Sequence, residues 1–283
     1  MKSVNLNTVK ERVKAAILDA SFHIDGKLAG KIRDFRAQER SPSGQEILDQ
    51  ILQNADIAAA DQLALCQDTG LAIFFVTLGE QVRLEYGAFA SLRDALTAAT
   101  REAYQEGYLR KSVCDPLTRK NSGDNTPVFI HWEVVPGDTC QITFMAKGGG
   151  SENMSALKMF SPSAGLPGIE DFIVDTVSKA GPNPCPPTVV GVAIGGNFDT
   201  SAYLAKRALL RDPLGTPSDD PACAELEKRV LTRLNKLGIG PMGYGGDTTV
   251  LALHVVTHPC HIASLPVAIN VNCHSHRIRA LEF

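Results

Sequence analysis

The sequence lacks the features that mark several specialised classes of protein. Lys and Arg number 28 and Asp and Glu number 31 among the 283 residues, so no excess of one charge indicates a nucleic-acid or anionic-membrane partner. No apolar run is long enough to cross a bilayer. The first residues also lack the apolar segment of a secretory signal. We therefore expect a cytoplasmic protein that binds neither nucleic acid nor membrane.

The sequence also contains no repeat, no low-complexity tract and no obvious linker. Its hydrophobic content of 44% and charged content of 21% are ordinary for a folded globular chain. The length suits one large domain or two closely associated lobes. We predict a single domain over residues 1–283, with two intimate lobes as the open alternative.

Helical and strand patterns follow one another without a regular βαβ order, which predicts a mixed α/β (α+β) fold with mixed sheets. Apolar residues recur at helical spacing over residues 5–60, and Ser41 followed by Pro42 is typical of a helix start. A turn at residues 136–138 between two strand-like segments predicts a β-hairpin. The expected helices cover 88–108 and 224–237 with another beginning near 199, and the expected strands cover 71–76, 81–85, 128–134, 141–145, 188–194, 250–256 and 265–271.

The seven cysteines are scattered and include no C-x-x-C pair of the kind that marks zinc or ferredoxin-type sites. An odd number in a chain without a secretory signal also argues against a disulfide framework. Cys140 and Cys223 lie in apolar contexts and are predicted to be core thiols. Three others lie in polar, proline-rich or glycine-rich segments, where loops from distant parts of the chain could build a metal site: Cys66, Cys185 and Cys273.

Three thiolates without an evident fourth ligand suit a cubane iron–sulfur cluster, because three protein ligands leave one iron open. An open iron can act as a Lewis acid on a substrate hydroxyl and carboxylate. Asp68, two residues from Cys66, could face the same cavity, and His274, His276 and Arg277 could bind cluster sulfur or an anion. From chemistry alone, each of these residues could instead be a solvated polar loop residue, and for His274 and His276 this alternative is an even one.

The triple glycine Gly148-Gly149-Gly150 follows a predicted strand, with Lys147 before it and Ser151 after it. Glycines let the backbone approach a ligand closely, and their N–H groups can bind an anion. A tight turn with no ligand is an equal alternative. The segment lacks the G-x-x-x-x-G-K-[ST] form of a P-loop, so we do not expect a nucleotide site.

Taken together, these segments resemble the alpha subunit of two-subunit class I fumarate hydratases and the related L-tartrate dehydratases. The resemblance runs from about residue 10 to the end of the chain. It rests on six motifs: Cys66-Gln67-Asp68-Thr69-Gly70, Leu109-Arg110-Lys111-Ser112, Gly123-Asp124-Asn125-Thr126-Pro127, Lys147-Gly148-Gly149-Gly150-Ser151, Cys185-Pro186-Pro187 and His261-Ile262-Ala263-Ser264-Leu265-Pro266.

The resemblance implies a [4Fe–4S] cluster bound by loops from distant segments, with Cys66, Cys185 and Cys273 as its ligands. It also implies that Asp68 and His261 take part in catalysis. The residues implied to contact the substrate are Gln67, Asp68, Arg110, Gly150 and His261. One departure is Cys260, where the family pattern has an arginine before the histidine. We assign no role to Cys260 or Cys114.

The implied activity is the reversible hydration of fumarate to L-malate, a reaction of the tricarboxylic acid cycle, with the open iron as Lewis acid. The resemblance also implies a separate beta subunit that supplies the remaining substrate-binding residues and the catalytic base, so we expect a heteromer such as α2β2. The nearest alternative is an L-tartrate dehydratase alpha subunit. An iron–sulfur sensor or regulatory module is the alternative from another class, and a structural zinc protein is a third.

Overall fold

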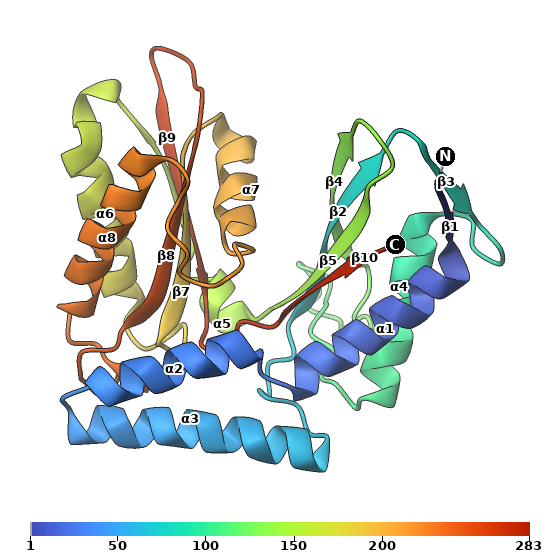
Figure 1. The fold of residues 1–283 in the computed structure, drawn as a ribbon, viewed down its shortest axis with the longest axis horizontal. Helices are drawn as coiled ribbons and strands as arrows, with labels where there is room; N and C mark the ends of the chain where they lie inside the picture. The colour runs from blue at the N-terminus through green and yellow to red at the C-terminus, as the bar shows by residue number, and fades with distance from the viewer. Residues whose placement is uncertain (1) are drawn as a thin grey trace. The chain divides into compact units, whose positions relative to one another are not determined.

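The computed structural model describes residues 2–283 and combines helices with mixed sheets, which confirms the predicted mixed α/β class (Figure 1). Contacts between Cα atoms divide the chain into two compact units. The first unit takes in the chain up to Asp25, residues 54–149 and residues 277–283. The second unit takes in residues 26–53 and 150–276. A single domain over 1–283 stays a prediction.

The first unit contains a four-stranded sheet with one face covered by two helices. The strand order is β10 (Ile278–Glu282), β5 (Cys140–Lys147), β2 (Leu71–Gly79) and β4 (Phe129–Val135). Phe74 and Phe144, on neighbouring central strands, point into a core shared with the covering helices α1 (Leu6–Phe22) and α4 (Leu92–Glu106). A separate two-stranded parallel ribbon pairs β1 (Lys2–Asn5) with β3 (Val82–Glu85).

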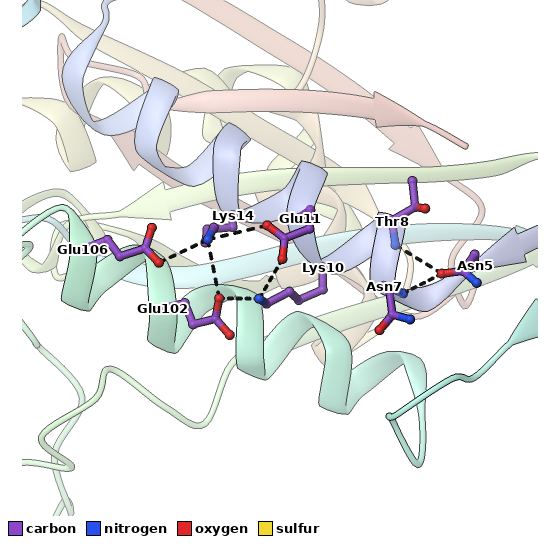
Figure 2. Close-up of polar contacts among 8 residues, drawn as sticks. All are labelled: Asn5, Asn7, Thr8, Lys10, Glu11, Lys14, Glu102 and Glu106. Atoms are coloured by element: carbon purple, nitrogen blue, oxygen red, sulfur yellow. Dashed lines mark hydrogen bonds and ion pairs between the residues drawn. The ribbon is translucent and has the colours of Figure 1, made fainter.

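Helices α1 and α4 pack together through an apolar stripe. Figure 2 shows the ion pairs that Lys10 and Lys14 of α1 form with Glu102 and Glu106 of α4. Val9, Val13 and Ile17 recur at helical spacing on α1 and are fully buried. Asn5 caps α1 by accepting hydrogen bonds from two backbone N–H groups of the first turn. Lys14 pairs with Glu106 of α4 at 3.1 Å, and because such pairs are solvated they contribute little beside the buried stripe.

The second unit has helices on both faces of another four-stranded sheet (Figure 1). The strand order is β6 (Ala156–Phe160), β9 (Leu265–Asn272), β7 (Thr188–Gly195) and β8 (Val250–His258). Helices α6 (Gly165–Ala180) and α8 (Pro221–Asn235) pack on one face, and α7 (Phe198–Ala208) packs on small residues of the other. The remaining helical elements are α2 (Gly26–Gln38), α3 (Pro42–Asp61), the short α5 (Gly149–Glu152) and the 3-10 turns η1 (Pro162–Ala164) and η2 (Pro241–Gly243).

The predicted hairpin around residues 136–138 is wrong. Strand β2 lies between β4 and β5, parallel to the first and antiparallel to the second. The turn instead crosses the end of β2, where Gly79 donates its N–H to Thr139 O at 2.6 Å and Gln81 donates to Gly137 O at 2.9 Å. The physical reason is that β2 is almost continuously apolar and buried, so its backbone needs a pairing partner on each edge.

The other predicted elements are found near their expected positions, including the helix that begins at Pro42, whose start is capped by Ser41. Strands β1, β6 and β10 and helix α6 were not predicted from the sequence. The three strands are only four or five residues long, which leaves a weak periodic signal. No helix within residues 2–283 is both long and apolar enough to span a bilayer.

His254, on β8, is a fully buried histidine in the core of the second unit. Its Nε2 accepts the Gly215 N–H at 3.0 Å, so its Nδ1 carries the hydrogen that faces Ala208 O at 3.0 Å. Burial, with the nearby Arg211 charge as the next cause, lowers the pKa of His254 to about 3. The side chain is therefore neutral and structural.

Acid should destabilise the protein through His254. Between pH 6.5 and 3 the unfolded chain binds a proton at this residue that the folded chain does not, so the free energy of unfolding falls as pH falls. At pH 5 the loss should be about 2 kcal/mol. Urea unfolding of the wild type and of His254→Gln at pH 7 and pH 5 measures it, and an equal pH dependence in both proteins would contradict this account.

Candidate functional site

In the first unit, the 66–70 loop (residues 66–70) is held by buried side chains that bind its main-chain carbonyls. Arg277 donates from Nη2 to Asp68 O at 2.7 Å. Tyr104, on α4, donates its hydroxyl to Thr69 O at 2.9 Å and Gly70 O at 3.0 Å. Asn125 donates from Nδ2 to Gly70 O at 3.2 Å. Because these three donors are at most 2% exposed, they fix the path of the loop from its buried side.

The same network attaches two other sequence motifs to the 66–70 loop. Thr69 donates its hydroxyl to the Arg110 carbonyl. The Oδ1 of Asn125 accepts the N–H groups of Ser112 at 2.7 Å and Val113 at 3.3 Å. The backbone of residues 110–113 is therefore tied to the loop, while the Arg110 side chain stays on an exposed segment after α4. The structure thus brings together the segments that carry Gln67, Asp68 and Arg110.

The Asp68 carboxylate is itself bound by backbone donors. Its Oδ2 accepts the Gly149 N–H at 2.6 Å, and its Oδ1 accepts the Gly70 N–H at 3.1 Å. A side chain at Gly148 would place its Cβ 2.9 Å from Asp68 Oδ2, so the carboxylate occupies the space that the glycine leaves. Gly70 has φ of +80°, and a Cβ there would lie 2.8 Å from the Lys147 backbone. Gly70 and Gly148 therefore allow the 66–70 loop to pack closely against the backbone around residue 147.

In the second unit, Cys185 and Cys273 come to the same end of the sheet. His274, which follows Cys273, directs its N–H (3.4 Å) and its Nδ1 (2.9 Å) to the Cys185 carbonyl. Cys185 has φ of +54°, which is unfavourable for a residue with a Cβ. Both thiols are half-buried, and Cys273 Sγ lies 3.0 Å from the Ser275 hydroxyl.

His261 does not join these two cysteines within the second unit. It lies in the exposed connection between β8 and β9, where its Nδ1 accepts the Ala263 N–H at 3.1 Å. Cys273 follows the other end of β9. Eight residues of extended strand separate the two ends by roughly 27 Å. A site that uses both residues would need His261 from a second polypeptide.

Of the predicted ligands, Cys66 belongs to the first unit and is half-buried on a bend, whereas Cys185 and Cys273 belong to the second. Within neither unit do three His, Cys, Asp or Glu side chains of residues 2–283 converge as a metal site requires. Ligation by the three cysteines stays a prediction. Gly150, the predicted backbone contact to the substrate, is the first residue of α5 that belongs to the second unit. A Cβ at Gly150 would lie 3.0 Å from Asn183 O, so the two backbone segments pack closely there.

The remaining cysteines divide by environment. Cys140 and Cys223 are buried, and burial raises the pKa of both thiols, as expected for core residues. Cys114 is half-buried and forms an isolated β-bridge with Asn121. Cys260 is exposed, and its Sγ lies 3.3 Å from Ser264 O.

Sequence reasoning missed Tyr104, which holds two of the loop carbonyls. A signal was present, because Tyr104 follows Leu96, Thr100 and Ala103 on the buried face of α4. A buried tyrosine hydroxyl normally has a hydrogen-bond partner, so this position predicts a polar contact inside the core. Burial also raises the pKa of the Tyr104 phenol well above its usual range, which keeps the hydroxyl a donor at ordinary pH.

Comparison with known proteins identifies the family. The family described as fumarate hydratase (Fumerase) matches residues 10–282. The chain is 39% identical over 270 residues to "Putative L(+)-tartrate dehydratase subunit alpha" of Methanocaldococcus jannaschii, which covers 93% of each chain. It is 31% identical over 280 residues to "L(+)-tartrate dehydratase subunit alpha" of Escherichia coli strain K12, which covers 98% of this chain and 91% of the relative. The chain therefore belongs to the fumarate hydratase (Fumerase) family of hydro-lyases.

Tyr104→Phe should destabilise the first unit, because it leaves two buried loop carbonyls with fewer donors. We expect a loss of about 1–3 kcal/mol in the free energy of unfolding, measured by urea denaturation. Tyr108→Phe is the matched control, since Tyr108 is 93% exposed and its hydroxyl faces solvent. Equal stability of the two variants would show that the Tyr104 hydroxyl does not hold the loop.

Proposed function

We propose that this chain is the alpha subunit of an iron–sulfur hydro-lyase that acts on a four-carbon hydroxydicarboxylate. The observation that supports this most strongly is the buried network around the 66–70 loop. It joins the segments of Gln67, Asp68 and Arg110 to Gly149, the second residue of the triple glycine, in one unit. A site that binds a dicarboxylate needs such a set of exposed donors and a cation on a rigid frame.

A [4Fe–4S] cluster fits the donor chemistry of the three predicted ligands. Cys66, Cys185 and Cys273 are half-buried on loops, unlike the inert core thiols of Cys140 and Cys223. The left-handed backbone of Cys185 is the kind of local strain that a ligand position can account for. When bound, such a cluster supplies a Lewis acid that polarises the C–O bond of a substrate hydroxyl.

The residues of this chain would then bind and orient the substrate. The exposed Arg110 side chain is suited to a bidentate contact with one carboxylate. Gln67 is also exposed, and its Oε1 lies 3.4 Å from the Cys66 thiol, so its amide is next to the first predicted ligand. Asp68, fixed by the Gly149 and Gly70 N–H groups, would orient the substrate hydroxyl and hold its proton.

A beta subunit would complete the site. The relatives of this chain are named subunit alpha, which supports the existence of a second kind of subunit. We assign to that subunit the base that removes the carbon-bound proton and the cations that stabilise the second carboxylate. The position of His261, far from Cys273 along β9, supports an α2β2 assembly in which a second alpha chain supplies this histidine.

Two substrates suit this site, and fumarate hydration to L-malate is our first proposal. L-tartrate dehydration is the second, favoured by the names of the relatives. L-malate and L-tartrate, the hydroxyl-bearing forms that such a site would dehydrate, differ by one hydroxyl. A cytoplasmic location is part of the same proposal. An iron–sulfur sensor, the alternative from another class, would bind an effector without turnover.

The test is an anaerobic assay of the complex. The chain is co-expressed with its candidate beta subunit, supplied with iron and sulfide, and assayed with L-malate and with L-tartrate. We expect turnover of L-malate that is lost in air. Selective turnover of L-tartrate would keep the reaction class and replace the substrate. Turnover of neither by protein that contains its cluster would contradict the hydro-lyase proposal and leave the sensor.

A further inference from the structure

Arg277 is a buried arginine of the first unit that the sequence offered only as a possible partner of cluster sulfur or an anion. Its side chain is 2% exposed, and its Nη2 donates to Asp68 O at 2.7 Å. Among residues 2–283, no acceptor lies within hydrogen-bond distance of its Nε or Nη1. These two nitrogens carry three of the five guanidinium N–H donors. Arg277 therefore makes far fewer hydrogen bonds than its burial would lead one to expect.

Within residues 2–283, the Arg277 guanidinium also forms no direct ion pair with a carboxylate. A guanidinium is always protonated in proteins, and a buried cation is costly unless it is paired. The nearby carboxylate is that of Asp68, but its two oxygens are bound by the N–H groups of Gly149 and Gly70. Arg277 binds the main-chain carbonyl of Asp68 instead. Burial is the main cause of the raised Tyr104 pKa, while the Arg277 charge lowers that pKa and the Asp68 charge raises it, so both charges act on the same hydroxyl.

The Arg277 guanidinium lies close to Asp68 and Gly148, in the segments proposed to bind substrate. A Cβ at Gly148 would be 3.9 Å from Arg277 Nη2 and 2.9 Å from Asp68 Oδ2, so the arginine and the aspartate both lie close to Gly148. A positive charge in a low-dielectric interior acts on neighbouring anions with little screening. Its effect on a ligand should therefore grow with the negative charge of that ligand.

We propose that Arg277 is a positioning residue of the dicarboxylate site. It fixes the main chain of Asp68, and its buried positive charge makes the 66–70 loop favour dianions over monoanions. The inference rests on the proposed function, because it assumes that the 66–70 loop faces a dicarboxylate. Arg277 does not contact the substrate itself, since its two unpaired nitrogens are buried.

The experiment separates charge from geometry in the assembled alpha–beta complex, kept anaerobic. Arg277→Lys keeps the charge, and Arg277→Gln keeps an N–H donor for the Asp68 carbonyl but removes the charge. The probes are succinate, a dianion that lacks the hydroxyl, and succinamate, the corresponding monoanion. Dissociation constants come from calorimetry, and KM and kcat come from the turnover assay. Iron and sulfide content are measured for each protein.

Two further variants serve as controls. Arg279→Gln removes the same charge two residues away, where the arginine pairs with Asp19 and donates to His23 O at 2.9 Å. Tyr104→Phe removes a carbonyl-binding donor of the same loop without changing its charge. Arg279→Gln should leave the binding of both probes within about twofold of the wild type. Tyr104→Phe should weaken the binding of both probes by the same factor.

For Arg277→Gln we expect succinate binding weakened at least tenfold, succinamate binding weakened threefold or less, and a rise in KM larger than the fall in kcat. Arg277→Lys should stay within threefold of the wild type for both probes. Equal weakening of the two probes by Arg277→Gln would overturn the proposal. A tenfold loss of succinate binding in Arg277→Lys would also overturn the proposal. This second measurement decides the question even if Arg277→Gln does not assemble with the beta subunit. A wild-type complex that neither binds succinate nor turns over substrate would instead refute the proposed function.

Discussion

The candidate site depends on one constraint, the pairing of the main-chain carbonyls of residues 68–70 inside the first unit. A buried carbonyl without a donor is costly, so the loop can take this path only where side chains reach it. Arg277, Tyr104 and Asn125 supply those donors from the position just before β10, a helix and a distant loop. The glycines beside Asp68 follow from the same packing, because a side chain at Gly148 would displace its carboxylate. Motifs that are far apart in the sequence therefore pack together into one local structure.

The second unit carries the other half of the proposed chemistry. Cys185 and Cys273 lie at one end of its sheet, held together through His274, while the exposed His261 lies at the other end of β9. An enzyme built from both units, with a beta subunit and a second alpha chain, would divide its site among several polypeptides. On this proposal, a chain of the fumarate hydratase family would contribute candidate ligands and substrate contacts, and its partners would contribute the rest of the catalytic set.

The sequence predicted the mixed fold and most helices. In long helices such as α1 and α4, apolar residues recur at helical spacing over several turns, and this pattern differs clearly from that of a strand. It did not predict that β2 would lie between β4 and β5, since strand order depends on pairing between distant segments rather than on a local pattern. Tyr104 was missed because its helical position looked like ordinary core. The strand predicted over 265–271 already separates His261 from Cys273, so their placement at opposite ends of β9 could have been derived from the sequence.

The central claim is that Cys66, Cys185 and Cys273 bind one iron–sulfur cluster, and metal analysis tests it most directly. Each cysteine is replaced by serine in turn, and iron and acid-labile sulfide are measured in the anaerobic alpha–beta complex. Cys114→Ser is the matched control, because Cys114 is also half-buried but has no predicted role. The account predicts that each of the three variants loses cluster and that the control keeps it. A Cys66→Ser protein with a full cluster and full activity would contradict the account.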